Sequence, residues 1–465
     1  MYKLLILILI SSITHAQDIT GDWHGQLNIM GTKLRISFHI KQDKGTYIST
    51  LDSLDQGAFD LATDSTEFVN GKLTISMKNL GADYVGTLDS KSIKGTFTQN
   101  GASFPLDLTG KEIAKPKVVI RPQDPIEPFE YLSEEVTFIN KSADSIKLAG
   151  TLTLPKDVEN PAVAILITGS GPQNRNEELG PFNHRPFLVL SDHLTKKGIA
   201  VLRYDDRGVA ESEGKHKGAT SADFATDVAA AVDYLKTRSD IDTHKIGLIG
   251  HSEGGFIAPM LASSRDDIAF IVMLAGTGVD GATILKTQGR KSAELSGEST
   301  EKLDFNEQLA GKVFDLVIQE KNTEKLVFKL SELFKKTLEN SPKEMTKDLT
   351  EETIQSQIKT LSSNWFQYFI RTDPQQFLSK VNCPVLAING EKDFQVLPKL
   401  NLNAIDRILK QANNKDFTIK ELAGMNHLFQ TAETGAITEY GTIEETFSPI
   451  ALNIVSEWIN KRFSQ

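Results

Sequence analysis

The sequence contains a single cysteine, Cys383, among 465 residues. No intrachain disulfide can form, so hydrophobic cores have to hold the fold together. Cys383 stands just before an apolar stretch at residues 384–388, and this position favours a buried structural thiol over a catalytic one. A chain of this length exceeds one ordinary core, so we expect two or three folding units.

The sequence also has fewer basic than acidic residues, 51 Lys and Arg against 61 Asp and Glu, and the formal net charge is −10 at pH 7. An acidic chain has no general electrostatic attraction for nucleic acid or anionic lipid, so we expect neither as a partner. Hydrophobic residues at 39% and charged residues at 24% are typical of a globular protein.

The amino terminus holds an unbroken apolar run at residues 4–10, preceded by Lys3. Small and polar residues follow as far as Ala16, with Thr14 and Ala16 at the −3 and −1 positions of a cleavage site. This pattern predicts a signal peptide at residues 1–16 and an exported protein, periplasmic or secreted. The run is too short for a permanent membrane helix, so no integral membrane segment is expected after cleavage.

Residues 17–112 alternate apolar and polar side chains in short runs that are separated by Gly, Asp, Asn and Ser. Such a period of two predicts a small all-β module, either a barrel or a sandwich. Residues 113–130 carry Pro116, Pro122, Pro125 and Pro128. Proline fixes φ and removes a hydrogen-bond donor, so this segment is predicted to be an extended linker.

Residues 131–465 predict an α/β domain with a mostly parallel sheet. Near-continuous apolar runs alternate with helical segments, as expected when helices cover both faces of the sheet. The predicted parallel strands are residues 163–168, 200–204, 245–250, 270–275, 385–389 and 417–421. Residues 280–375 interrupt this pattern with amphipathic helices, which predict a helical cap inserted at one end of the sheet.

The strongest catalytic signal is Gly250-His251-Ser252-Glu253-Gly254, which follows an apolar strand and opens a helix. A Gly-x-Ser-x-Gly sequence in that context predicts a tight strand-to-helix turn with Ser252 as an exposed nucleophile. Small residues at positions 250 and 254 prevent side-chain clashes in the turn. The other interpretation is a glycine-rich turn with an inert serine.

A serine needs a base to accept its proton, and His427 follows the last predicted strand. Asp393 follows the strand at residues 385–389 and is the preferred acid to orient the base, with Glu391 as the alternative. The chain order Ser252, Asp393, His427 is that of an α/β-hydrolase. His251 is adjacent to the serine, and we expect its side chain to point elsewhere.

Two backbone N–H groups are expected to bind the oxyanion of an acyl-transfer reaction. One is that of Glu253, directly after the nucleophile, and the other is that of Ser170, with Gly171 as the alternative. No metal and no organic cofactor is required by this chemistry.

Two further segments, one charged and one aromatic, have side chains that could bind substrate but are not assigned to the site. The charges of Asp205-Asp206-Arg207 are expected to pair with one another and to fix the loop beneath the turn, rather than to bind substrate. The last cap segment is aromatic, and we expect at least half of its side chains to form the cap core instead of a substrate pocket. These aromatic residues are Trp365, Phe366, Tyr368 and Phe369.

In these motifs the sequence resembles exported bacterial α/β-hydrolases of the serine esterase type, which join an N-terminal β module to the hydrolase domain. The resemblance rests on the segments beginning at Gly169, Arg203, Gly250, Asn389 and Asn426. It implies a carboxylesterase for small acyl esters with Ser252, Asp393 and His427 as the triad. Ala210 stands where this family usually has glycine.

Two other functions stay open. Related hydrolases include aminopeptidases, which need an acidic cluster for the substrate ammonium, and Glu177 and Glu178 are candidates for it. A non-catalytic protein that binds envelope material or glycans would require a degraded triad, and the motifs are intact. The sequence leaves the oligomeric state unknown.

Overall fold

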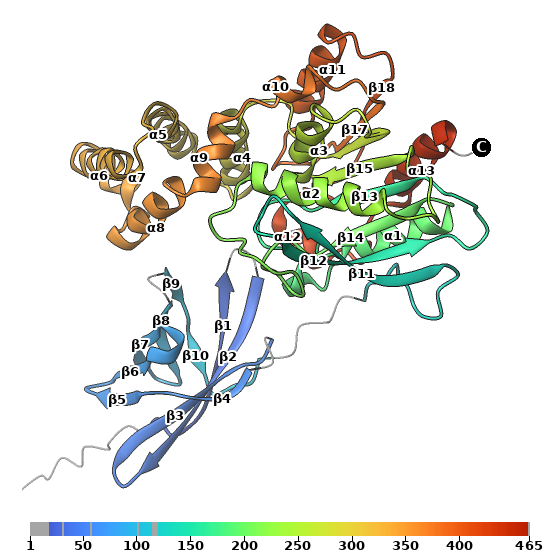
Figure 1. Cartoon of the computed structure of the whole chain (residues 1–465). Helices are drawn as coiled ribbons and strands as arrows, with labels where there is room; N and C mark the ends of the chain where they lie inside the picture. The colour runs from blue at the N-terminus through green and yellow to red at the C-terminus, as the bar shows by residue number, and fades with distance from the viewer. Residues whose placement is uncertain (1–17, 30–31, 56–57, 100–101, 114–119, 464–465) are drawn as a thin grey trace, which may run out of the picture. The chain divides into compact units, whose positions relative to one another are not determined.

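The computed structural model describes residues 18–29, 32–55, 58–99, 102–113 and 120–463. The chain divides into two compact units, residues 1–117 and 118–465 (Figure 1). The predicted signal peptide, residues 1–16, lies outside the described residues. The second unit includes residues 120–130, which the sequence assigns to the linker. The domain boundaries drawn from the sequence stay predictions.

The first unit is a single antiparallel sheet with the order β4-β3-β2-β1-β10-β8-β7-β6-β5, and β9 pairs with β8. Alternate residues of β6 are buried, as the period of two predicts. Ser49 of β3 hydrogen-bonds Thr66 of β5 at 2.7 Å, so the sheet curls into a half-barrel. The strands are β1 Gly21–Ile29, β2 Thr32–Asp43, β3 Thr46–Ser53, β4 Ala58–Ala62, β5 Ser65–Val69, β6 Lys72–Met77, β7 Ala82–Asp89, β8 Ser92–Gln99, β9 Ala102–Pro105 and β10 Leu108–Thr109, with a short 3-10 helix at Lys78–Leu80.

The second unit contains an eight-stranded sheet with the order β11-β12-β14-β13-β15-β16-β17-β18. The pairs β11–β12 and β12–β14 are antiparallel, and the remaining pairs are parallel. The strands are β11 Leu132–Asn140, β12 Ile146–Leu154, β13 Val163–Ile167, β14 Ala200–Tyr204, β15 Ile246–His251, β16 Phe270–Leu274, β17 Val385–Gly390 and β18 Phe417–Leu422. Because the carboxyl ends of parallel strands meet at one edge, the loops after β13, β15, β17 and β18 share that edge.

Helices cover both faces of this sheet. One buried cluster joins it to α2, α3 and α11, and another joins its opposite face to α1 and α13. The helices that cover the sheet are α1 Pro186–Lys196, α2 Ser221–Leu235, α3 Gly254–Ala262, α11 Pro398–Gln411 and α13 Pro449–Phe463, with α12 Ile437–Tyr440 and a 3-10 helix Gly180–Phe182 in the connecting loops.

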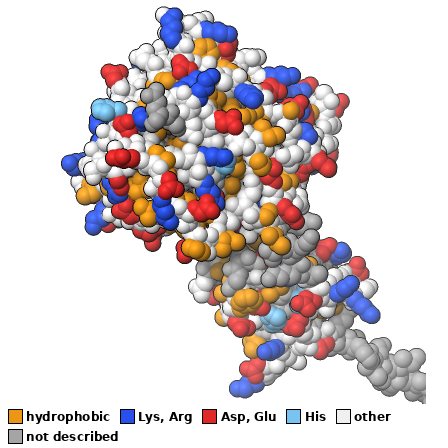
Figure 2. Space-filling view, turned by 90° about the vertical axis from the view of Figure 1, so that its right-hand side faces the viewer, with side chains coloured by type: hydrophobic (Ala, Val, Ile, Leu, Met, Phe, Trp, Pro, Cys, Tyr) orange, Lys and Arg blue, Asp and Glu red, His pale blue; other side chains and the backbone are white. Residues whose placement is uncertain are grey.

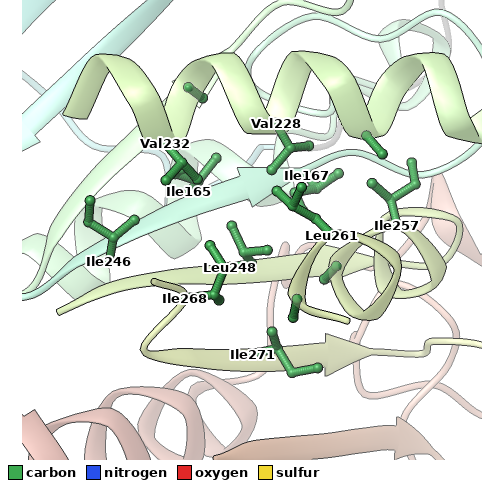
Figure 3. Close-up of a cluster of buried hydrophobic side chains, with 14 of the residues drawn as sticks. Ile165, Ile167, Val228, Val232, Ile246, Leu248, Ile257, Leu261, Ile268 and Ile271 are labelled. Carbon is green, nitrogen blue, oxygen red and sulfur yellow. The ribbon is translucent and has the colours of Figure 1, made fainter. Parts of the chain in front are cut away.

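The packing of α2 and α3 on the sheet positions the turn after β15. Val232 and Val228 of α2 point toward Ile165 and Ile167 of β13 across the buried layer (Figure 3). Each such side chain contributes about 1.5–3 kcal/mol when it is fully buried.

At the start of α2, the Thr220 hydroxyl accepts from the Asp223 N–H while the Asp223 carboxylate accepts from the Thr220 N–H. This capping box fixes where the helix begins.

A helical insertion lies between β16 and β17, as the sequence predicts. It has its own core, which includes Val317, Leu330 and Phe334. Its helices are α4 Gly281–Leu295, α5 Thr300–Gln319, α6 Thr323–Asn340, α7 Lys343–Thr346, α8 Glu351–Leu361, α9 Asn364–Arg371 and α10 Gln375–Leu378. Within the described ranges, no helix is both long and apolar enough to cross a bilayer. On the face drawn in Figure 2, acidic and basic side chains of the larger unit are interspersed.

Arg121 anchors the segment that leads into the second unit. Its guanidinium donates to the carbonyl oxygens of Phe182 at 2.8 Å and Tyr440 at 3.0 Å, and also to that of Ile443. Gln123 adds hydrogen bonds to the backbone of Thr446 and Phe447. These contacts hold residues 121–123 against the α/β unit, so this part of the predicted linker is not a free spacer.

Candidate active site

Ser252 lies on the tight turn between β15 and α3. Its φ is +53°, a left-handed conformation that costs a non-glycine residue on the order of 1 kcal/mol or more. The Ser252 N–H donates to the Leu274 carbonyl at 2.8 Å, and its carbonyl accepts from the Gly255 N–H at 3.0 Å. These bonds enforce the strained turn, which is the geometry of a nucleophile elbow.

The two glycines of the motif are required by close backbone contacts. A Cβ at Gly250 would lie 2.0 Å from the carbonyl oxygen of Gly254. A Cβ at Gly254 would lie 2.1 Å from the carbonyl oxygen of Ile167, in β13. Any larger residue at either position would push the turn away from the sheet.

Asp393 and His427 meet at the carboxyl edge of the sheet. The Nδ1 atom of His427 lies 2.7 Å from Oδ2 of Asp393, and both side chains are buried. Oδ1 of Asp393 accepts from the N–H groups of Gln395 and Val396 at 2.8 and 2.9 Å. The carboxylate is therefore fixed on both oxygens, with one of them facing the imidazole. Glu391, the alternative acid, instead accepts from the Gly424 N–H.

The reactive atoms of the predicted pair are not engaged elsewhere. Within the described residues, neither the Ser252 hydroxyl nor Nε2 of His427 hydrogen-bonds to a protein group. Ser252 is partly exposed. Hydrogen bonds between a nucleophile and its base are often long before substrate binds, so this geometry is compatible with catalysis.

The loop that carries two of the predicted oxyanion donors, Ser170 and Gly171, begins beside Ser252. Gly169 approaches Ser252 so closely that a Cβ there would lie 3.3 Å from the Ser252 Cβ. Among the described residues, the N–H groups of Ser170, Gly171 and Glu253 have no protein acceptor. Glu253 precedes α3, so its N–H belongs to the positive end of the helix dipole. Unpaired N–H groups beside the serine can bind a developing negative charge.

The side chain of Glu253 lies behind the turn, buried between two elements. It accepts from the Ser221 hydroxyl at 2.5 Å and from the Trp365 indole N–H at 2.8 Å. Burial raises the pKa of Glu253 above its ordinary value. Trp365 belongs to α9, so the helical insertion contacts the residue that follows the predicted nucleophile.

The cap aromatics divide between two environments. Phe366 packs in the core of the insertion, as expected. Trp365 stacks on Phe369 with ring centroids 5.5 Å apart, and Phe369 packs edge-on against Phe256 of α3. Tyr368 lies against the core of the α/β unit. These rings join the insertion to the elbow region.

The charged loop after β14 is fixed by partners outside itself, so the prediction that its charges pair with one another is wrong. Arg207 pairs with Asp227 of α2 at 2.7 Å, and Asp205 pairs with Arg175 at 2.6 Å. Asp206 accepts from the Thr168 hydroxyl and the Gln173 N–H. Burial raises the pKa of Asp206 to about 7. The loop is still a structural support under the turn, as expected.

Glu177 and His251 form a buried pair that the sequence did not reveal. Oε1 of Glu177 lies 2.8 Å from Nδ1 of His251 and accepts from the Gly169 N–H at 2.9 Å. Nε2 of His251 lies 3.0 Å from the His427 carbonyl oxygen. The only sequence signal is a histidine next to the nucleophile, and it gives no hint of a partner 74 positions away.

The comparison with protein-family models agrees with this architecture. The family model of serine aminopeptidases, S33, matches residues 185–432, more than half of the chain, and this range includes Ser252, Asp393 and His427. Esterase EstD of Thermotoga maritima is 24% identical over 306 residues, covering 65% of this chain and 63% of EstD. The putative hydrolase YtaP of Bacillus subtilis is 30% identical over 149 residues, covering 29% of this chain and 50% of YtaP.

The chain thus spans less than two thirds of the length of these curated relatives. Among solved structures, the Pyrococcus furiosus esterase Pf2001 has a TM-score of 0.42 and 18% identity, covering 72% of this chain and 93% of Pf2001. The predicted fold class is confirmed by the sheet order and the family match. The chain belongs to the serine aminopeptidase S33 family of α/β-hydrolases.

Proposed function

We propose that this protein is a serine carboxylesterase that hydrolyses small acyl esters, with Ser252, His427 and Asp393 as its triad. The observation that carries the proposal is the buried hydrogen bond of 2.7 Å between Asp393 and His427, at the sheet edge where Ser252 occupies a strained turn. A carboxylate on Nδ1 holds the imidazole in the tautomer that leaves Nε2 free to accept a proton.

The reaction follows acyl-enzyme chemistry. Ser252 Oγ attacks the ester carbon while Nε2 of His427 takes its proton. The C–O bond of the tetrahedral intermediate then breaks, and the alcohol leaves with the proton from His427. Water attacks the acyl-enzyme with His427 again as base, which releases the acid and restores Ser252. The N–H groups of Ser170 and Glu253 bind the oxyanion in both steps, with Gly171 as the alternative to Ser170.

The second candidate is an aminopeptidase on the same triad, in keeping with the family's description. It needs free carboxylates for the substrate ammonium. Glu177 is paired with His251, and Glu178 accepts from Asn174 and Arg185. Both acids are already engaged, which favours the ester over the peptide. The name of esterase EstD points in the same direction.

The test compares the purified protein with Ser252→Ala on p-nitrophenyl acetate and butyrate, alongside leucine p-nitroanilide. We expect ester turnover that the variant loses, and fluorophosphonate labelling of Ser252 in the wild-type protein alone. Turnover of the anilide alone would select the aminopeptidase. If the wild-type protein turns over neither the esters nor the anilide, and fluorophosphonate does not label Ser252, the result would instead favour a non-catalytic protein that binds envelope material or glycans.

We also propose export to the periplasm or the medium, on the strength of residues 1–16. Mass spectrometry of the protein from fractionated cells tests this proposal. The exported form is expected to begin at Gln17, and an intact Met1 in the cytosolic fraction would contradict it.

A further inference from the structure

Glu177 is buried beside the loop that carries the proposed oxyanion donors. Only 3% of its surface is exposed, and its φ is +52°, a left-handed conformation for a non-glycine residue. Its carboxylate accepts from the Gly169 N–H, the residue before Ser170. Glu177 therefore fixes this loop next to Ser252.

His251 continues the connection from Glu177 to the proposed base. Both of its ring nitrogens face oxygen atoms, those of the Glu177 carboxylate and the His427 carbonyl, so with Glu177 ionised both nitrogens donate. Burial lowers the pKa of His251, but the charge of Glu177 and these hydrogen bonds outweigh it and raise the pKa above its ordinary value. The rings of His251 and His427 lie 4.7 Å apart.

A continuous series of hydrogen bonds thus runs from the Gly169 N–H through Glu177 and His251 to the backbone of His427. Its two ends are the loop that would bind the oxyanion and the residue that would move the proton. Buried ion pairs add little to stability compared with well-packed apolar residues, so stability alone does not account for this pair.

We propose that Glu177 and His251 are positioning residues that hold the oxyanion loop and the His427 loop in register for the acyl-transfer step. This inference rests on the proposed function. A displacement of about 1 Å between reacting groups lowers a rate by on the order of a hundredfold, so loss of the pair acts on kcat. Both side chains are buried, so we expect no direct contact with the substrate and little change in KM.

Four variants test this proposal with p-nitrophenyl butyrate as substrate: Glu177→Ala, Glu177→Gln, His251→Ala and His193→Gln. Glu177→Gln is the conservative replacement, because both hydrogen bonds of Glu177 end on Oε1, and the amide oxygen of glutamine can still accept from the Gly169 N–H and from an Nδ1–H of His251. His193→Gln is the control, since His193 is half-buried on α1 and contacts Ser456 away from the site. Circular dichroism gives the folded fraction of each variant.

We expect Glu177→Ala and His251→Ala to lower kcat about ten- to a hundredfold with KM within about threefold, whereas Glu177→Gln keeps kcat within about fivefold. His193→Gln should match the wild type. The proposal is overturned if the alanine variants retain the wild-type kcat, or if kcat falls only in proportion to the folded fraction. An inactive wild-type protein that fluorophosphonate does not label would instead overturn the proposed function.

Discussion

The indole N–H of Trp365, in the helical insertion, donates to the carboxylate of Glu253 at 2.8 Å. Glu253 also supplies a proposed oxyanion donor through its backbone N–H. One residue therefore receives the insertion on its side chain and offers its main chain to the substrate. Movement of α9 relative to the turn at Ser252 would change the surroundings of the Glu253 side chain and of its backbone N–H together. The insertion is therefore coupled to the proposed oxyanion site.

Replacing Trp365 with Phe removes this hydrogen bond and keeps the aromatic packing. The variant leaves the buried Glu253 carboxyl without the Trp365 donor, and a buried acceptor that loses a partner costs about 1–3 kcal/mol, so we expect a loss of about 2 kcal/mol in the free energy of unfolding, measured in urea. Trp458→Phe is the matched control, because its indole N–H donates to the neutral hydroxyl of Thr418 and its loss should cost about 1 kcal/mol. Equal losses in both variants would show that the burial of the Glu253 carboxyl does not make this hydrogen bond more costly to lose.

Asp393→Asn replaces the proposed orienting acid with a neutral isostere. The amide cannot stabilise the imidazolium and favours the wrong tautomer of His427, so we expect kcat to fall roughly a thousandfold or more on p-nitrophenyl butyrate. Glu391→Gln is the comparison, since the Glu391 carboxylate contacts Gly424 and not the imidazole. A larger loss of kcat in Glu391→Gln would show that Glu391, and not Asp393, orients His427.

His184 makes stability depend on pH. Burial, followed by the charge of Arg121, lowers its pKa to about 3 from an ordinary value of 6.5. Between these values the unfolded chain binds a proton that the folded protein does not, so stability falls as the pH decreases. This one residue should cost about 2 kcal/mol between pH 6.5 and 4.5.

Urea titrations of the wild type and of His184→Gln at these two pH values measure that contribution. Between pH 6.5 and 4.5 the free energy of unfolding should fall by about 2 kcal/mol less in the variant than in the wild type. This difference does not depend on how stable the variant is at pH 6.5. Identical pH dependence in both proteins would show that the pKa of His184 does not change on folding.

Ala210 adopts a φ of +46° at the position where the resembling family has glycine. The left-handed conformation costs an L-residue about 1–2 kcal/mol, whereas glycine adopts it freely at a smaller entropic cost in the unfolded chain. Ala210→Gly should therefore raise the free energy of unfolding by about 0.5–1 kcal/mol. Ala229→Gly, inside α2, is the control and should lower the free energy of unfolding by about 1 kcal/mol. If both variants are less stable than the wild type, Ala210 is not strained.

The sequence alone predicted the fold class because the relevant signals are local. A period of two, apolar strands followed by helices, and a glycine-flanked serine are each encoded in a few consecutive residues. The chain order of Ser252, Asp393 and His427 then selected an α/β-hydrolase, and the family match agrees with it. The positions of these three residues after β15, β17 and β18 follow from the same local patterns.

Only the tertiary structure decided which charges meet. Arg207 pairs with Asp227 and Asp205 pairs with Arg175, instead of the neighbours that the sequence places beside them. Glu177, a candidate for holding a substrate ammonium, is buried against His251. Local patterns fix strands and turns because the backbone has few conformations. A buried charge takes whichever partner the folded chain brings within hydrogen-bonding distance, because an unpaired charge is costly away from water, and sequence separation does not limit that choice.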